Sequence, residues 1–483
     1  MSSLKKQAAT GALWIGIERF GQQGIQFVVS IILARLLAPA EFGLIAMVAI
    51  FTSLATRLAF GGFSGALVQR SSVTDSDIST VLWYNISLGI IGFIILWLCA
   101  PYIADFYSEP RLTAITRWNS LVILFSSLEM THGAMLLKEM QFRKRSVATI
   151  LGVIISGGVS IIMAFKGFGV WALVAQGLVM HAVITAMYWL RASWRVRLVF
   201  DTTAFKEMFS FGHNLMLTVL VRTVFENIYA VIIGRLYTAT DLGYFQRGKR
   251  FTLLFSQVPA MMLSQLSFPL LAKHQHNKRE MLRIFSRLFR VGIVAIMPLL
   301  TGMAVAAPNM IVVLVGEKWL PSVPYLRILC VTGIFYTMFS LCSDVLRGCG
   351  EGRVFLKCEV TKHVLTMLSI IILFRMGIKL LLIGEAVATA IGFIIVSISA
   401  MRSLESSMVD MLKWLIKPGV AACVMGLVVG LLRPNDFTIL GLGVKVMAGA
   451  GAYALVLIVL RDDVVRLIWN MSKRRVCGIR VGW

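Results

Sequence analysis

The chain has 483 residues, of which 58% are hydrophobic and only 14% are charged. This apolar excess is greater than soluble globular domains carry, and it indicates an integral membrane protein. The formal net charge of +24 does not point to nucleic acid, because the Lys and Arg residues form no single face or tail and lie between apolar runs, as topology signals do.

Apolar runs long enough to cross a bilayer recur along almost the whole chain and leave no stretch for a soluble catalytic domain. The pattern predicts an all-α integral membrane protein of about 14 transmembrane helices that is not an enzyme. Residues 307–316 either continue the ninth helix or form a loop, because Pro308 tends to break a helix. The expected helices cover residues 11–37, 43–69, 81–104, 113–137, 146–165, 168–190, 209–236, 248–270, 288–306, 322–346, 358–375, 379–400, 414–432 and 437–460.

The first apolar segment follows Lys5 and Lys6, which is the order of features in a signal peptide. It also carries Glu18 and Arg19 and is longer than the apolar region of a signal peptide. We therefore expect it to remain in the protein as the first transmembrane helix.

The basic residues indicate the orientation of the chain. If the N-terminus is cytoplasmic, the cytoplasmic connections include the cluster Lys138, Arg143, Lys144 and Arg145, and the basic tail 473–475. Few basic residues then fall on the outside. The positive-inside rule thus predicts that both termini are cytoplasmic.

An internal repeat links the first and seventh expected helices at an offset of 200 residues. Ile32-Leu33-Ala34-Arg35-Leu36 matches Ile232-Ile233-Gly234-Arg235-Leu236, and Glu41-Phe42-Gly43 matches Asp241-Leu242-Gly243. Because six helices is an even number, both copies enter the membrane from the same side, which predicts two parallel-repeat six-helix bundles. The expected domains are residues 1–200 and 201–405, followed by a C-terminal helix pair and basic tail at 406–483.

Helix 7 has a polar stripe inside the expected membrane span. Asn214, Thr218, Arg222 and Glu226 follow one another at four-residue spacing and so share one face, on which Arg222 and Glu226 can pair. Each ionised residue at the bilayer centre costs roughly 2.5–3.5 kcal/mol on insertion scales. The stripe should therefore avoid lipid.

Helix 1 has a similar stripe of Glu18 and Gln22 with Arg19 beside it, and helix 2 adds Arg57. Two interpretations stay open. The stripes are either a static polar seam between the two halves or the lining of a hydrated groove, and we favour the groove.

Helix 8 begins with Arg247, Lys249 and Arg250 at its expected outer end, and it carries Pro259 near its middle. Pro298 lies at the same depth in helix 9. A proline inside a helix removes a hydrogen bond and bends it, so each is either a hinge or only a bend.

Other polar residues predict no further site. His274 and His276 lack acidic or thiol companions at metal-ligand spacing, and the seven cysteines form no CxxC pair. His181 stands alone in its expected helix. We therefore expect no metal and no cofactor.

Several segments resemble one family. ILARLLAPAEFG, at 32–43, is similar to the junction of helices 1 and 2 in Wzx-type polysaccharide flippases of the multidrug/oligosaccharidyl-lipid/polysaccharide exporter superfamily. Four more segments resemble the colanic-acid-like branch, namely 66–70, 137–142, 242–247 and 316–319, the last running on to Leu329.

The resemblance implies a flippase of the bacterial cell inner membrane that moves an undecaprenyl-diphosphate-linked oligosaccharide repeat unit outward by alternating access. Its product would serve exopolysaccharide, capsule or lipopolysaccharide biosynthesis. The implied partners are this lipid-linked oligosaccharide and membrane lipids, with polymerase and chain-length proteins of the same pathway as further candidates and no nucleic acid. Proton and sodium coupling both stay open.

Our hypothesis for the site is that basic side chains attract the diphosphate while carboxylates balance the charge or carry a coupling proton. A cation-coupled multidrug exporter, a peptidoglycan lipid-precursor flippase and a non-transporting scaffold stay open as alternatives. The candidate substrate-binding residues are Arg19, Gln22, Arg57, Arg222, Arg247, Lys249 and Arg250, and the coupling candidates are Glu18 and Glu226.

Overall fold

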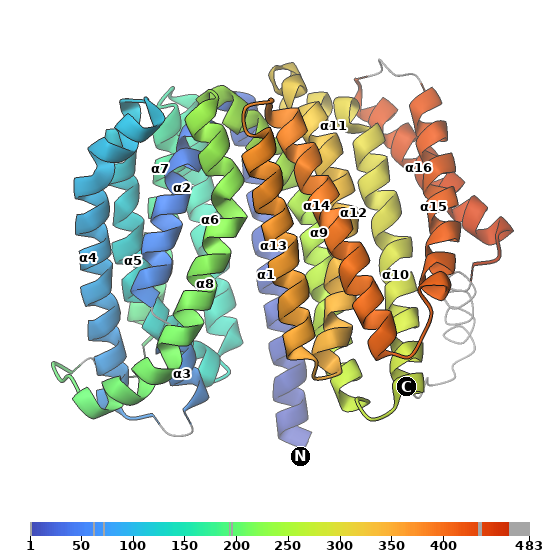
Figure 1. Ribbon diagram of the computed structural model, residues 1–483. Coiled ribbons are helices and arrows are strands. Elements are labelled where there is room, and N and C mark those ends of the chain that lie inside the picture. Colours follow the sequence, from blue (N-terminus) through green and yellow to red (C-terminus); the bar gives the residue numbers. More distant parts are fainter. Residues whose placement is uncertain are drawn as a thin grey trace. The chain divides into compact units, whose positions relative to one another are not determined.

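The structure is a computed structural model that describes residues 2–60, 63–70, 73–192, 194, 197–432 and 437–462. Within these ranges the side chains at 2–13, 15, 59, 60, 64, 204, 210–215, 217 and 218 lie outside the description. The described chain is helical and contains no strand (Figure 1). It has two compact units, Met1–Gly243 and Tyr244–Trp483.

The first unit is a bundle in which neighbouring helices pack in a continuous series. α1 packs on α6, α6 on α7, α7 on α5, and α5 on both α4 and α2, while α8 packs on α2. Its helices are α1 (Ser2–Leu36), α2 (Pro39–Phe60), α3 (Phe63–Gln69), α4 (Asp75–Tyr107), α5 (Arg111–Lys138), α6 (Phe142–Phe165), α7 (Val170–Leu190) and α8 (Thr202–Leu236).

The second unit contains most of α9 and all the helices that follow it. α12 packs on α10 and α14, α13 packs on α14, and the terminal pair α15 and α16 packs on α10. These helices are α9 (Ala239–Lys273), α10 (Lys278–Val305), α11 (Ala307–Val315), a 3-10 turn η1 (Glu317–Ser322), α12 (Val323–Gly348), α13 (Gly352–Leu373), α14 (Ile378–Ser403), α15 (Met408–Leu431) and α16 (Ile439–Val459).

The internal repeat is visible in the packing of each unit. The helix pairs α4–α5, α5–α7 and α6–α7 of the first unit correspond to α10–α12, α12–α14 and α13–α14 of the second, and all six pairs are in contact. The helix pairing of the first unit thus recurs in the second, as a duplication requires, while the parallel orientation of the two copies stays a prediction. The domain boundary at residue 200 was predicted from the repeat and stays a prediction. The compact units follow a different criterion, the contacts within the chain, and the first of them extends to Gly243 and includes α8.

The repeat is most exact where the first residues of α9 cross α2. A Cβ at Gly43 would lie 1.7 Å from the carbonyl oxygen of Ala239, and a Cβ at Gly243 would lie 2.0 Å from that of Pro39. The two contacts are related by the offset of 200 residues. Only glycine allows two helix backbones to approach this closely.

Each of the fourteen expected spans overlaps a helix of the structure. Eleven helices of the described residues are long and apolar enough to cross a membrane. The other three long helices, α1, α8 and α13, are not among these eleven. The full count of fourteen spans and the cytoplasmic location of both ends therefore stay predictions.

The structure bears on two of the expected spans. The second span was expected as one helix over 43–69; α2 covers it as far as Phe60 and α3 from Phe63, and residues 61 and 62 lie outside the described residues. Residues 307–315 are neither a loop nor part of α10, because α10 ends at Val305 and Pro308 lies in the first turn of a separate helix, α11. Proline suits this position, since the amide it lacks has no partner in a first turn.

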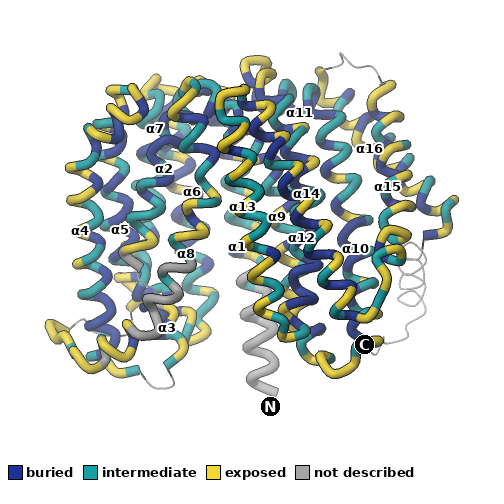
Figure 2. The backbone as a smooth tube through the Cα atoms, in the orientation of Figure 1, coloured by how far each residue is buried: buried dark blue, intermediate teal, exposed yellow. Residues whose placement is uncertain are grey.

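Exposed residues occur along the length of the helices (Figure 2), and many of them are large and apolar. On α4, Ile91, Ile95 and Leu98 are 50%, 56% and 63% exposed. Asn85 and Gly89 of the same helix are buried. A helix with apolar residues on its exposed side needs lipid around it.

Candidate functional site

The polar face of α1 contains a paired carboxylate. Glu18 is 9% exposed, accepts a hydrogen bond from Ser146 Oγ at 3.1 Å and lies 3.4 Å from Arg145 Nε. Both partners come from α6, on which α1 packs. Of the neighbouring candidates, Gln22 is half-buried and Arg19 is exposed.

The polar face of α8 carries an exposed ion pair. Arg222 Nε lies 2.6 Å from Glu226 Oε1, and the two side chains are 72% and 52% exposed. The pairing predicted from their spacing is thus present. An exposed pair of this kind contributes little in water and is costly in hydrocarbon, so this face requires water or a polar ligand beside it.

The remaining positions of this stripe are partly outside the description. The side chains of Asn214 and Thr218 are not among those the structure describes, and neither is the tail at 473–475. Arg57 on α2 is exposed, and α2 is the helix on which α8 packs. The first unit therefore offers Arg19, Arg57 and Arg222 as accessible cations.

The second unit contains the basic residues at the start of α9, and they differ in exposure. Arg247 is only 4% exposed, and its guanidinium carbon lies 4.5 Å from the ring centroid of Trp319. This is a buried cation–π contact. Lys249 interacts electrostatically with Glu385 of α14, whereas Arg250 is exposed.

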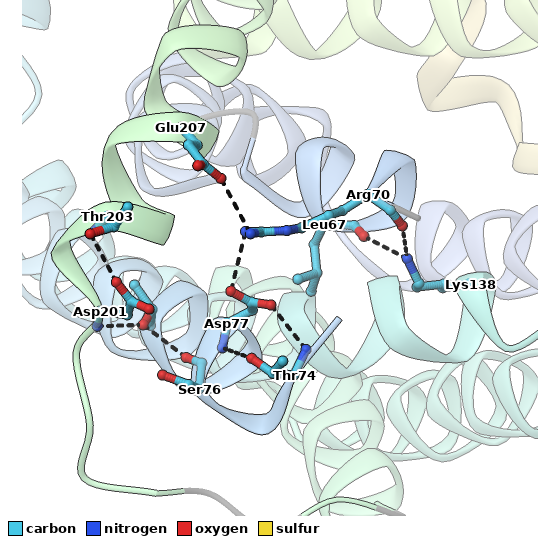
Figure 3. A network of polar contacts seen from close by, with 10 residues as sticks. Leu67, Arg70, Thr74, Ser76, Asp77, Lys138, Asp201, Thr203 and Glu207 are labelled. Carbon is cyan, nitrogen blue, oxygen red and sulfur yellow. Dashed lines mark hydrogen bonds and ion pairs between the residues drawn. The ribbon is translucent and has the colours of Figure 1, made fainter. Parts of the chain in front are cut away.

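A polar network fastens the end of α3 to its neighbours (Figure 3). Arg70 lies 3.2 Å from both Asp77 of α4 and Glu207 of α8. Lys138, the last residue of α5, donates from Nζ to the carbonyl oxygens of Leu67 and Arg70. A lysine at the C-terminal end of a helix satisfies carbonyls that have no partner within the helix and opposes the negative end of its dipole.

The segments that carry the family resemblance meet in pairs within each unit. In the first unit, segment 137–142 contacts segment 66–70 through Lys138. In the second, segment 242–247 contacts segment 316–319 through Arg247 and Trp319. These residues of the family-like segments therefore connect neighbouring elements within each unit. The exposed charges on α1, α2 and α8 lie outside the four segments.

Sequence reasoning missed a polar group between α5 and α7. His181 Nδ1 lies 3.0 Å from Glu129 Oε1 and 3.3 Å from Ser126 Oγ. The expectation that His181 stands alone was therefore wrong, because its partner is 52 residues away in sequence. The one available signal was Glu129 itself, an acidic residue inside the expected span 113–137.

Comparisons with known proteins agree with this architecture. Residues 32–324 match the model of a family described as polysaccharide biosynthesis protein. The chain is 26% identical over 467 residues to the teichuronic acid biosynthesis protein TuaB of Bacillus subtilis, covering 95% of this chain and 96% of that protein. It is 25% identical to the lipopolysaccharide biosynthesis protein WzxC of Escherichia coli, covering 82% of this chain and 80% of that one.

Among solved structures, the lipid II flippase MurJ in an inward closed conformation superposes with a TM-score of 0.74. The match covers 94% of this chain and 100% of that one, at 15% sequence identity. At this identity the likeness shows a shared fold, that of a polytopic membrane transporter.

Proposed function

Because the chain belongs to the polysaccharide biosynthesis protein family, we propose that it is a flippase for an undecaprenyl-diphosphate-linked oligosaccharide repeat unit. The family and its relatives show a transmembrane transporter of the Wzx type that takes part in polysaccharide biosynthesis. The proposal adds the substrate, the outward direction and the bacterial inner membrane as its location.

The physical problem for such a protein is the headgroup of the substrate. A sugar diphosphate is anionic and rich in hydroxyl groups, and each polar group left unpaired in hydrocarbon costs several kcal/mol. Unassisted flipping is therefore very slow. A protein lowers the barrier by offering cations and hydrogen-bonding groups within the depth of the membrane.

The exposed Arg222–Glu226 pair carries the proposal. Arg222 lies 14 residues before the end of α8, about 21 Å along the helix axis, well inside a hydrocarbon core of about 30 Å. Its side chain is 72% exposed, and its guanidinium has the planar geometry that binds phosphate oxygens bidentately. Glu226 holds the guanidinium in place and limits the excess positive charge.

The other candidate residues take supporting roles in this proposal. Arg19 and Arg57 are exposed cations of the first unit, and Gln22 offers amide hydrogen bonds to sugar hydroxyls. Among the candidate residues of the second unit, Arg250 is exposed. Arg247 is packed on Trp319, so we assign it to holding the start of α9 rather than to direct phosphate contact.

Outward movement would follow an alternating-access cycle, in which the polar face opens first to the cytoplasm and then to the other side. A membrane potential that is negative inside favours outward movement of an anion by about 2.3 kcal/mol per charge per 100 mV. The prenyl tail would stay in lipid throughout.

The experiment compares two exposed Arg–Glu pairs at different depths. Arg222→Ala removes the mid-helix cation, while Arg111→Ala removes a cation that pairs with Glu109 at 2.8 Å at the start of α5. At equal protein levels in the membrane, we expect Arg222→Ala to lower surface polysaccharide at least tenfold and Arg111→Ala to leave it unchanged. Equal polysaccharide in the two strains would remove Arg222 from the proposed site.

A second candidate function is flipping of a peptidoglycan lipid precursor, which the fold likeness to MurJ favours. Deletion of the gene separates the two candidates. Loss of a peptidoglycan precursor flippase is lethal, whereas loss of the proposed function alters only surface polysaccharide. Transport of cationic dyes by the purified protein would instead favour a multidrug exporter.

A further inference from the structure

Two titratable side chains meet in the middle of the first unit. Glu129 lies nine residues before the end of α5 at Lys138, and His181 lies nine residues before the end of α7 at Leu190. Each is therefore about 14 Å along its helix from that end. In a hydrocarbon core of about 30 Å, the pair lies close to the midplane.

The geometry of the pair is suited to holding a proton. His181 Nδ1 lies 3.0 Å from Glu129 Oε1, and the two side chains are 28% and 14% exposed. The second carboxylate oxygen, Glu129 Oε2, is buried and has no hydrogen-bond partner among the described residues.

A carboxylate costs free energy if it is ionised, has one buried oxygen without a hydrogen-bond partner, and lies next to a neutral imidazole. One added proton relieves it, either as imidazolium, which forms an ion pair, or as a neutral carboxylic acid. Release of that proton leaves one uncompensated negative charge in the bundle. The geometry thus places the two groups so that they can share a single proton.

Nearby charges lie on the helices that pack around the pair. Tyr188, two turns after His181 on the same face of α7, interacts electrostatically with Glu129, with Glu18 of α1 and with Arg145 of α6. Glu18 and Arg145 neutralise each other across 3.4 Å. They therefore form a fixed pair beside the Glu129–His181 site.

The other titratable and charged groups on the neighbouring helices have partners of their own or are exposed. On α5 itself, His132 is buried with its ring 4.8 Å from that of Trp189. α4 contributes Asp77, which pairs with Arg70 at the end of α3. α2 packs on both α5 and α7 and carries the exposed Arg57.

The carboxylates that sequence reasoning selected for coupling are less suited to bind a proton. Glu18 accepts from Ser146 and faces Arg145, and Glu226 faces Arg222. Each therefore already has a cation as its ion-pair partner.

We propose that Glu129 and His181 form the proton-binding site that couples transport to proton entry. This inference rests on the proposed flippase function. In each cycle the site takes up one proton from water on the outer side and returns it to water on the cytoplasmic side, and no other bond changes. Proton binding would stabilise one of the two states of alternating access.

The first test measures the protonation of the His181 imidazole. The full chain, labelled with ¹⁵N-histidine, is reconstituted in phosphatidylethanolamine–phosphatidylglycerol liposomes and titrated by solid-state NMR. The His181 signal is the one that His181→Gln removes. We expect Glu129→Gln to lower the proton affinity of this imidazole at least tenfold, while Glu139→Gln, which removes an exposed carboxylate from the end of α5, leaves it unchanged.

A cellular measurement then tests coupling. With Glu129→Gln or His181→Gln, surface polysaccharide at equal protein levels should fall at least tenfold and lose its dependence on external pH. An unchanged His181 titration in Glu129→Gln, or wild-type polysaccharide in both variants, would overturn the proton site. Neither result would overturn the flippase function, which the Arg222→Ala strain tests separately.

Discussion

The crossing of α2 with the start of α9 gives a sharp prediction about the duplicated architecture. Gly43→Ala would place a Cβ 1.7 Å from the carbonyl oxygen of Ala239, and Gly243→Ala would place one 2.0 Å from that of Pro39. In both cases the obstacle is backbone, which cannot rotate away. The helices must separate by at least about 1 Å to reach a tolerable contact.

Overpacking of this kind costs typically 1–3 kcal/mol. Because the contact is backbone to backbone, we expect about 3 kcal/mol for each variant. Gly24→Ala is the matched control, since nothing lies within 4 Å of a Cβ at that position of α1. Alanine in place of a helical glycine should even stabilise the control by about 0.5–1 kcal/mol.

The assay is thermal unfolding of the purified variants in one detergent. Gly43→Ala and Gly243→Ala should both melt well below the wild type, and Gly24→Ala at or above it. If Gly43→Ala and Gly24→Ala melted at the same temperature, the close crossing would be refuted. If only one of the two glycines mattered, the two contacts would not be equivalent copies.

Three further outcomes are expected. Lys138→Met should cost about 1–3 kcal/mol of unfolding free energy in the same melting assay, because the carbonyls at the end of α3 lose a charged donor; unchanged melting would show that water replaces it. Trp319→Ala should cost about 3–5 kcal/mol, since it removes a fully buried ring and the contact of Arg247, and a loss below 1 kcal/mol would contradict this packing. Ile95→Asp should sharply lower the amount of protein in the membrane, because α4 exposes this residue to lipid, whereas Ile95→Leu should not.

The helices could be predicted from sequence because lipid imposes a simple length and composition on them. The expected spans 81–104 and 113–137 lie within α4 and α5. The repeat could also be predicted from sequence, because Gly43 and Gly243 occupy equivalent positions 200 residues apart where close backbone contact requires glycine.

The polar contacts could be predicted only where they lie within one helix. Arg222 and Glu226 are one turn apart, so their spacing alone predicted the pair. Glu129 and His181 meet only because α5 packs on α7. Likewise, the contact of Arg247 with Trp319 depends on how α9 lies against η1, which no local pattern encodes.

The central claim, that this protein moves a lipid-linked oligosaccharide outward, is tested most directly by the location of the substrate. Radiolabelled undecaprenyl-diphosphate-linked oligosaccharide is measured in spheroplasts, and a membrane-impermeant oxidant reports the fraction in the outer leaflet. We predict that this fraction is close to zero in a deletion strain and in Arg222→Ala, and that the wild type and Arg111→Ala restore it. An outer-leaflet fraction in the deletion strain equal to that of the wild type would contradict the claim.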